Sequence, residues 1–475
     1  MTNSGNNNFL DKLKPEFLFL AAGIIFGLFY VFINPPFQSN DEDRHFFRAY
    51  AIADGQISPQ QGDGVIGYDI PTNLISVTQS FQGIPYFNGT KLKPGTIEKA
   101  KKVPLKKKTT TFYTHADKYN PIAFMHVVPG IFLGKYINDN PVWLHWFGRI
   151  SGLFMYLIVV FIAIRITPVF KNLFLVLALT PMWLFQACSI SYDTMSNALS
   201  ILMAALFLYF AFAKEGKLKR NDYLLVILLT GLFPFMKNGY PLVPFLFFIV
   251  PLSKLGDMKT EKFKTISKAV LMGIFFWLSF SLPNYTWGKY LASQDLINDK
   301  YVAIHKEYKN DPKTHIKFLK ENPSGFVSTV VDNILFQGEE WTAGTIGRFG
   351  YSYAKLPNAV LIIHGLVLLL TAFTDGKKNI SFSTYQKAVV LFIGTGSALG
   401  IVVGTYLYMT KIGGELIFGL QGRYFLPAIP ALLLFLYNSE FTLEKISKYK
   451  PVIVTAYISL ILIYSIMFMS DYYYM

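Results

Sequence analysis

Charged residues, cysteine and the common catalytic motifs are scarce or missing in this chain. Its 475 residues include one cysteine, Cys188, so no disulfide can form within the chain, and only 15% are charged. There is no GxxxxGK[ST] loop, no GxGxxG run that follows a predicted strand, no HExxH and no GxSxG. These absences argue against nucleotide hydrolysis, dinucleotide redox chemistry and serine hydrolysis.

Hydrophobic residues are abundant instead, at 52% of the chain, and long apolar runs recur from residue 143 to the end. A hydrocarbon core of about 30 Å is crossed by about 20 helical residues. The sequence therefore predicts an all-α integral membrane protein in the lipid bilayer, with one domain over 1–475. We expect about 11 transmembrane helices, at 16–33, 143–164, 169–187, 194–213, 222–236, 240–253, 264–284, 356–374, 384–409, 418–438 and 451–470.

Basic residues are distributed unevenly between the loops that join these runs. With the N-terminus in the cytoplasm, the loops on that side carry 19 Lys and Arg, and the short loops opposite carry two, Lys237 and Lys411. This is the bias of the positive-inside rule, and it explains the net charge of +15 without a nucleic-acid partner. The scheme requires that 121–137, which contains Pro129, does not cross the membrane.

Two large segments then lie on the outer side, 34–142 and 285–355. Neither has a strand-rich pattern, so we expect helical loops: an amphipathic helix near the start of the first segment and two or three short helices in the second. The short runs 222–236 and 240–253 contain prolines and predict a pair of broken helices whose turn carries Lys237.

The stretch 34–48 is the most informative part of the chain. In a helix that begins there, Asp41, His45 and Arg48 follow at i, i+4 and i+7, and Glu42 precedes His45 by three residues, so these groups would share one face. A carboxylate near a His and an Arg at the membrane boundary can act as a general base. The alternative is a capping box, because acids are also favoured at a helix N-terminus.

The same acidic stretch suits a divalent metal such as Mg²⁺ or Mn²⁺, for which Asp41, Glu42 and Asp43 offer oxygen ligands. The pattern alone does not choose between a metal, a base and a helix cap.

Several other polar residues map to the outer half of the predicted bundle. Asp193 opens an apolar helix, and Lys237 can bind a phosphate or reach lipid headgroups. An Arg inside the apolar boundary, such as Arg423, is costly unless it is paired, and its fork suits a phosphate. The candidate substrate-binding residues are Arg48, Arg149, Asp193, Lys237, Glu339, Trp341, Arg423 and Tyr424. Acids and phosphate-binding cations at one membrane surface indicate a lipid-linked phosphate substrate.

Two stretches resemble the signature motifs of one family: PPFQSNDEDRHFFRAYAIADGQ after the first span and the late QGRYFLPAIPALLL. They are similar to motifs of polytopic bacterial membrane proteins grouped as domain of unknown function 2142, which looks like a branch of the GT-C glycosyltransferase superfamily. The resemblance implies a GT-C-like core in the bacterial cytoplasmic (inner) membrane and an extracytoplasmic site that takes a polyprenyl-phosphate sugar donor.

The resemblance also implies roles. Asp41 or Glu42 would be the catalytic base, supported by His45 and Arg48, and Lys237 and Arg423 would hold the donor phosphate. We therefore expect a GT-C-type glycosyltransferase that modifies a cell-surface glycan, a lipid-linked acceptor or another acceptor. Two alternatives stay open: a transporter or flippase of lipid-linked glycans, and a non-catalytic scaffold in an envelope polysaccharide complex. No internal repeat of the kind frequent in transporters is present.

Overall fold

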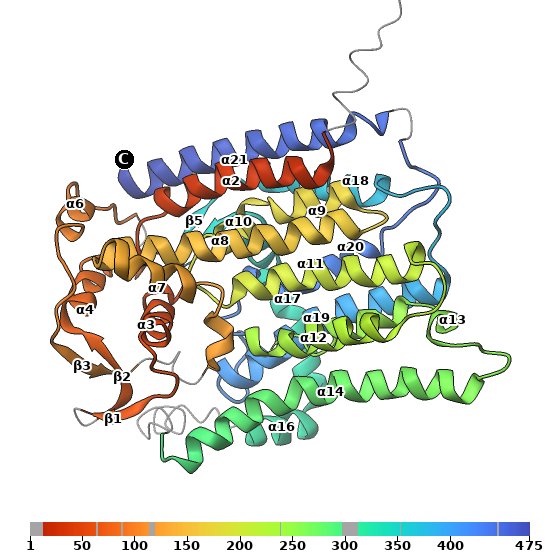
Figure 1. Cartoon of the computed structure of the whole chain (residues 1–475), viewed down its shortest axis with the longest axis horizontal. Coiled ribbons are helices and arrows are strands. Elements are labelled where there is room, and N and C mark those ends of the chain that lie inside the picture. Colours follow the sequence, from red (N-terminus) through yellow and green to blue (C-terminus); the bar gives the residue numbers. More distant parts are fainter. Residues whose placement is uncertain are drawn as a thin grey trace, which may run out of the picture.

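The computed structural model describes residues 13–475 except 63–64, 87–88, 114–118, 238, 297–311, 352 and 444–445. In this part of the chain, six helices are long and apolar enough to cross a membrane, and they lie side by side in Figure 1. They are α2 (Pro15–Ile33), α8 (Pro141–Ile166), α11 (Asp193–Leu208) with its continuation η3 (Tyr209–Ala213), α14 (Lys262–Ser293), α19 (Thr384–Met409) and α21 (Lys450–Tyr474).

Shorter helical segments complete the bundle and its flanks. They are α3 (Glu42–Ala53), α4 (Thr72–Gln79), α5 (Gly83–Tyr86), α6 (Thr96–Ala100), η2 (Pro121–Phe124), α7 (Val128–Ile137), α9 (Lys171–Ala178), α10 (Pro181–Ala187), α12 (Arg220–Met236), η4 (Val243–Ile249), α13 (Leu252–Leu255), α16 (Pro312–Glu321), α17 (Pro323–Ile346), α18 (Asn358–Thr374), η5 (Gly422–Ala428) and α20 (Ile429–Leu434).

The class of multi-pass helical membrane protein is confirmed, whereas six described helices, not about 11, are both long and apolar enough to be a span. Several predicted spans are divided. The run 169–187 forms α9 and α10, and the second begins at Pro181, where proline lacks an amide hydrogen and disfavours a helical residue before it. The run 240–253 is mainly the 3-10 helix η4, and 418–438 forms η5 and α20.

Helix α11 forms the centre of the bundle. All of its residues, Asp193–Leu208, are buried. The outer helices α2, α14, α19 and α21 instead expose large apolar side chains such as Phe29, Trp277, Phe392 and Leu460. An exposed apolar belt around a buried centre is the surface that a bilayer covers.

The segment 121–137 does not form a span. Helix α7 has 10 residues, which corresponds to about 15 Å, half of a hydrocarbon core. It lies against α8 at very short range, because a Cβ at Gly130 would come within 2.1 Å of the Phe147 carbonyl oxygen. Only glycine fits there.

The segments 34–142 and 285–355 are not purely helical, which differs from our expectation. Strands β1 (Gln60–Gly62), β2 (Val65–Pro71) and β3 (Thr109–Phe112) form an antiparallel sheet in that order, and β4 (Arg348–Phe349) pairs with β5 (Ala354–Lys355). The short β3 has three successive threonines, whose branched side chains favour extended backbone.

The segment 285–355 contains the end of α14, the short helix α16 and the long helix α17, so its described helices are not all short as predicted. Helix α14 continues past the expected end of its span to Ser293, and α17 alone has 24 residues. Part of this segment, 297–311, lies outside the described residues.

A buried ion pair joins α3, the helix that follows α2, to the bundle. Arg149 Nε and NH2 donate to the two carboxylate oxygens of Glu42 at 2.8 and 2.6 Å, and both side chains are fully buried. The other donors of Arg149 bind the main-chain oxygens of Val31, Asn34 and Pro35. All five guanidinium N–H groups are thereby used. One side chain of α8 therefore fixes the end of α2 and the start of α3.

Three further groups contact the Glu42 carboxylate. The main-chain N–H of Ile190 donates to Oε1 at 3.0 Å, that of Ser39 to Oε2 at 3.3 Å, and His145 Nε2 lies 3.3 Å from Oε1. Burial would raise the pKa of Glu42, but the charge of Arg149 and then His145 lowers it below its ordinary value. Glu42 is a charged structural anchor.

We expect Arg149→Ala to lower the free energy of unfolding by about 3–5 kcal/mol, because Glu42 is left charged and buried without its cation. Thermal unfolding of the purified protein in detergent measures this loss. Arg165→Ala, in the exposed last turn of the same helix, is the matched control and should change stability by less than about 0.5 kcal/mol. Equal stability of the two variants would contradict the anchoring role.

Candidate active site

Asp193, the first residue of α11, binds two cations from distant parts of the chain. Its Oδ1 accepts from Lys237 Nζ and its Oδ2 from Arg423 NH1, both at 2.7 Å. Lys237 directly follows α12, and Arg423 lies in η5. Asp193 and Arg423 are buried, and Lys237 is mostly so. One carboxylate cannot neutralise two cations, so these three residues, called the cation cluster below, carry a net positive charge.

Tyrosine rings form one wall of the cation cluster. Lys237 Nζ lies 4.1 Å from the centre of the Tyr424 ring and 5.4 Å from that of Tyr192. The guanidinium carbon of Arg423 is 5.0 Å from the Tyr424 ring centre. Contacts of this kind stabilise a cation without neutralising it, so the positive charge stays available to an anion.

Asp41 lies near the cation cluster, just before α3. Its backbone is left-handed, with φ 56°, a conformation that Asp tolerates better than most residues. Tyr351 Oη accepts a hydrogen bond from the Asp41 N–H at 3.1 Å and donates to Oδ1 at 3.4 Å. The side chain is half-buried, and its charge acts on His45, Lys237 and Arg423.

The two sequence motifs meet at one oxygen atom. Gln421 Oε1 accepts from Asn40 Nδ2 at 3.0 Å and from Arg423 Nε at 2.8 Å. The next residue, Gly422, packs so tightly that a Cβ there would lie 2.1 Å from the Trp341 carbonyl oxygen. Backbone contact with α17 therefore holds the segment that carries Arg423.

His45 lies near both acids of the site, Asp41 and Asp193, whose charges act on its ring. Its Nδ1 is 3.3 Å from the Ile190 carbonyl oxygen, and its ring centre is 4.9 Å from that of Tyr192. Burial lowers the pKa of His45 below its ordinary value, which favours a neutral ring at neutral pH.

Only some of the site residues predicted near the start of α3 lie at the cation cluster. Asp41 and His45 lie at the cation cluster, but Glu42 is taken up by Arg149, and Arg48 donates to the carbonyl oxygens of Gln56, Ile57 and Tyr119. The expectation that the four acidic and basic side chains of α3 share one face does not hold. Asp41 adopts a left-handed conformation before the helix begins, so it leaves the helical register.

Two further candidates lie outside the cation cluster. Glu339 is exposed and binds Lys355 at 3.2 Å. Trp341 is buried, with its ring centre 6.0 Å from that of Phe425, and it packs η5 rather than lining an open site.

The acidic stretch does not form a metal site. In the described ranges, no group of three or more His, Cys, Asp and Glu side chains is placed to hold a metal ion. Both oxygens of Glu42 already accept hydrogen bonds from Arg149 and main-chain N–H groups, so the residues present do not fit an ion bound by Asp41, Glu42 and Asp43.

Sequence reasoning missed three members of the site: Asn40, Gln421 and Tyr351. Asn40 and Gln421 stand inside the two motifs, one residue before Asp41 and two before Arg423, and could have been found there. Tyr351 follows a Gly-rich stretch, and no residue pattern around it indicates a functional site.

The fold and the site define a multi-pass helical membrane protein with a buried charge cluster. The family described as a predicted membrane protein, domain of unknown function 2142, matches residues 24–434. The chain belongs to this family, which confirms the resemblance of its two motifs. The matched range contains the whole site from Asn40 to Tyr424. No curated protein and no solved structure matches the chain.

The free energy of unfolding should decrease as the pH is lowered, because of His126. This side chain contacts the loop before Asp193. Its Nε2 bonds the Ser191 carbonyl oxygen at 3.0 Å, and burial lowers its pKa to about 4 from 6.5. The unfolded chain therefore takes up the proton first, and up to roughly 3 kcal/mol of stability is lost as the pH falls from about 6.5 to about 4.

His126→Gln keeps a donor and removes the titration, so its unfolding temperature should fall less than that of the native protein between pH 7 and pH 5. Identical pH profiles of the two proteins would show that His126 titrates normally in the fold.

Proposed function

We propose that this protein is a GT-C-type membrane glycosyltransferase. It takes a sugar from a polyprenyl-phosphate donor and transfers it to a cell-surface glycan or another acceptor on the outer face of the cytoplasmic membrane. The observation that carries the proposal is the position of Asp41, a half-buried carboxylate near two cations, Lys237 and Arg423, that are both ion-paired directly with Asp193.

The cation cluster is suited to a phosphate. Asp193 holds the side chains of Lys237 and Arg423 in place before any ligand binds. The binding of a phosphate therefore costs little side-chain entropy. Arg423 donates through Nε to Gln421 and through NH1 to Asp193, and among the described residues none accepts from its NH2. This NH2 and the Lys237 ammonium can bind phosphate oxygens.

Asp41 supplies the base. In the proposed step it removes the proton of the acceptor hydroxyl while the acceptor oxygen forms a bond to the anomeric carbon. The bond from that carbon to the phosphate oxygen breaks, and its electron pair leaves with the lipid phosphate, where Lys237 and Arg423 stabilise the developing charge. Glu42 is unsuited to this role because it is buried and fully hydrogen-bonded.

The sequence supports the same proposal independently. The acidic motif follows the first span, as in GT-C enzymes, and the bias of basic residues predicts an outer location for 34–142. The rival function, transport of a lipid-linked glycan, would use the same cations without breaking a bond.

We expect Asp41→Asn to reduce sugar transfer by a factor of about 10²–10⁴, because the acceptor proton has no base. The assay uses purified protein in detergent with a polyprenyl-phosphate sugar and an acceptor, and detects released polyprenyl phosphate. Glu339→Gln, which neutralises an exposed carboxylate outside the site, should keep native activity.

Native activity in Asp41→Asn would eliminate the proposed base. An absence of polyprenyl phosphate release by the native protein would favour transport, since detergent abolishes the two sides of the membrane and leaves only chemistry to detect.

Lys237→Gln and Arg423→Gln should each lower kcat/KM for the donor by roughly 10- to 100-fold, which corresponds to one charge-assisted hydrogen bond to the phosphate. The KM for the acceptor should stay near its native value. Lys355→Gln removes a lysine outside the site and serves as the control. Unchanged donor kinetics in both cluster variants would show that the phosphate binds elsewhere.

A further inference from the structure

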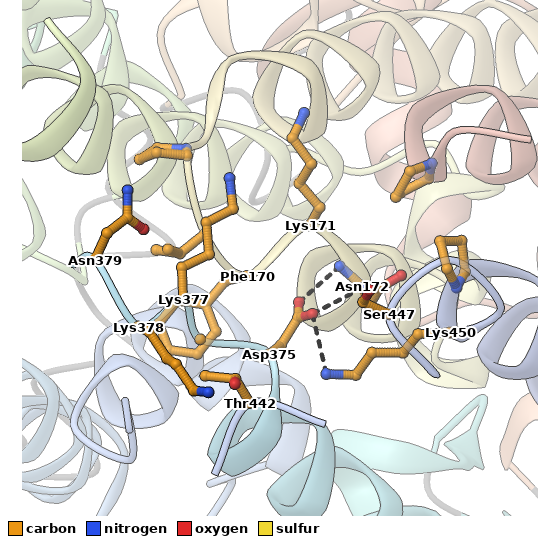
Figure 2. Close-up of a pocket in the computed structure, with 15 residues that line it drawn as sticks. Phe170, Lys171, Asn172, Asp375, Lys377, Lys378, Asn379, Thr442, Ser447 and Lys450 are labelled. Carbon is orange, nitrogen blue, oxygen red and sulfur yellow. Dashed lines mark hydrogen bonds and ion pairs between the residues drawn. The ribbon is translucent and has the colours of Figure 1, made fainter. Parts of the chain in front are cut away.

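A second charged site lies at the other end of the bundle. The cavity in Figure 2, about 510 Å³, is bordered by the starts of α2, α9 and α21 and by the chain after α18. Helix α2 separates it from the cation cluster, since Pro15 borders the cavity and Asp41 follows the far end of that helix. The cavity therefore belongs to no part of the proposed active site.

Asp375, the acid that lines this cavity, already has hydrogen-bond donors for both carboxylate oxygens within the protein. Asp375 Oδ2 accepts from the main-chain N–H groups of Asn172 and Leu173 at 2.8 and 3.0 Å, and Oδ1 accepts from Asn172 Nδ2 at 2.7 Å. Lys450 Nζ lies 3.4 Å from Oδ1 (Figure 2). Asp375 and Lys450 are both buried, and their charges cancel.

The remaining charge in the cavity is positive. Lys171 and Lys377 also line it, and the charges of Lys14, Arg165 and Lys377 all act on Lys171, whose ammonium group donates to the Ile164 and Arg165 carbonyl oxygens at 2.8 Å. The one carboxylate near Lys171 is that of Glu16, among the described residues, at 3.8 Å.

Within the described chain no side chain accepts a hydrogen bond from Lys377 Nζ. In Figure 2 the Lys171 and Lys377 side chains extend to the same side of the cavity. Cations gathered in this way repel one another, and a bound anion would relieve the repulsion.

We infer that this cavity binds a phosphate group, and that the phosphate is the headgroup of an anionic phospholipid. Lysine ammonium groups bind phosphate as point charges, and basic pockets between membrane helices bind lipid headgroups on the cytoplasmic side. The distribution of basic residues predicts that this end of the bundle faces the cytoplasm, where anionic lipid is available. A soluble phosphate would have the same chemistry and is distinguished by the experiment. The inference does not depend on the proposed enzymatic activity.

The experiment measures the unfolding temperature of the full chain in detergent during titration with phosphatidylglycerol, phosphatidylcholine or inorganic phosphate. The test variant is Lys171→Gln/Lys377→Gln, which removes the two lysines that extend to the same side of the cavity. The matched control, Lys259→Gln/Lys262→Gln, removes two exposed lysines that do not line the cavity. Lys377→Gln alone is used if the double variant is less stable than the native protein before lipid is added.

We expect phosphatidylglycerol to raise the unfolding temperature of the native and control proteins, and phosphatidylcholine to have no effect. The test variant should need roughly 10- to 30-fold more phosphatidylglycerol for the same shift, about 1 kcal/mol for each lysine lost. An equal shift with inorganic phosphate would support the phosphate site and overturn the lipid as its source. The phosphate site is wrong if neither ligand shifts the native protein, or if test and control variants respond alike.

Discussion

The buried pair of Glu42 and Arg149 is the interaction on which the end of the bundle that holds the cation cluster depends. The guanidinium fixes the end of α2 and the start of α3, and the Glu42 carboxylate also accepts the Ile190 N–H in the loop that leads to Asp193. The helix after Asp41 and the loop before Asp193 are thus positioned by one carboxylate. A buried ion pair adds little net stability over apolar packing, but removing one partner is costly. Its role here is to define one arrangement of three segments.

Adjacent acids consequently have opposite roles. Glu42 is fully buried and saturated with hydrogen bonds, whereas Asp41 is half-buried and lies beside Lys237 and Arg423. The left-handed backbone at Asp41 separates the two, because it turns the chain just before the helix begins. A regular helix through both residues would have placed their side chains about 100° apart, with no such division between anchor and open site.

The membrane class could be predicted from the length of the apolar runs, and the family from its two motifs. The meeting of Asp193, Lys237 and Arg423 could be predicted because an unpaired charge in lipid is costly. All three depend on local properties of the sequence. The partner of Glu42 could not, since Arg149 lies 107 residues away and no pattern links them. The broken spans were also missed, because hydropathy measures how apolar a run is and not whether it stays helical. The small sheet depends on pairing between β2 and β3, which are separated in the described chain by the three short helices α4, α5 and α6.

The hydrogen bond between Asn40 and Gln421 has a consequence for the synthesis of the protein on the ribosome. The two residues are 381 positions apart, so at 5–20 residues per second a ribosome needs roughly 20 to 80 seconds to make the second after the first. Throughout that interval the early loop is present without Arg423. A nascent chain interrupted before Gln421 can fill the bilayer with helices and still lack an assembled cation cluster.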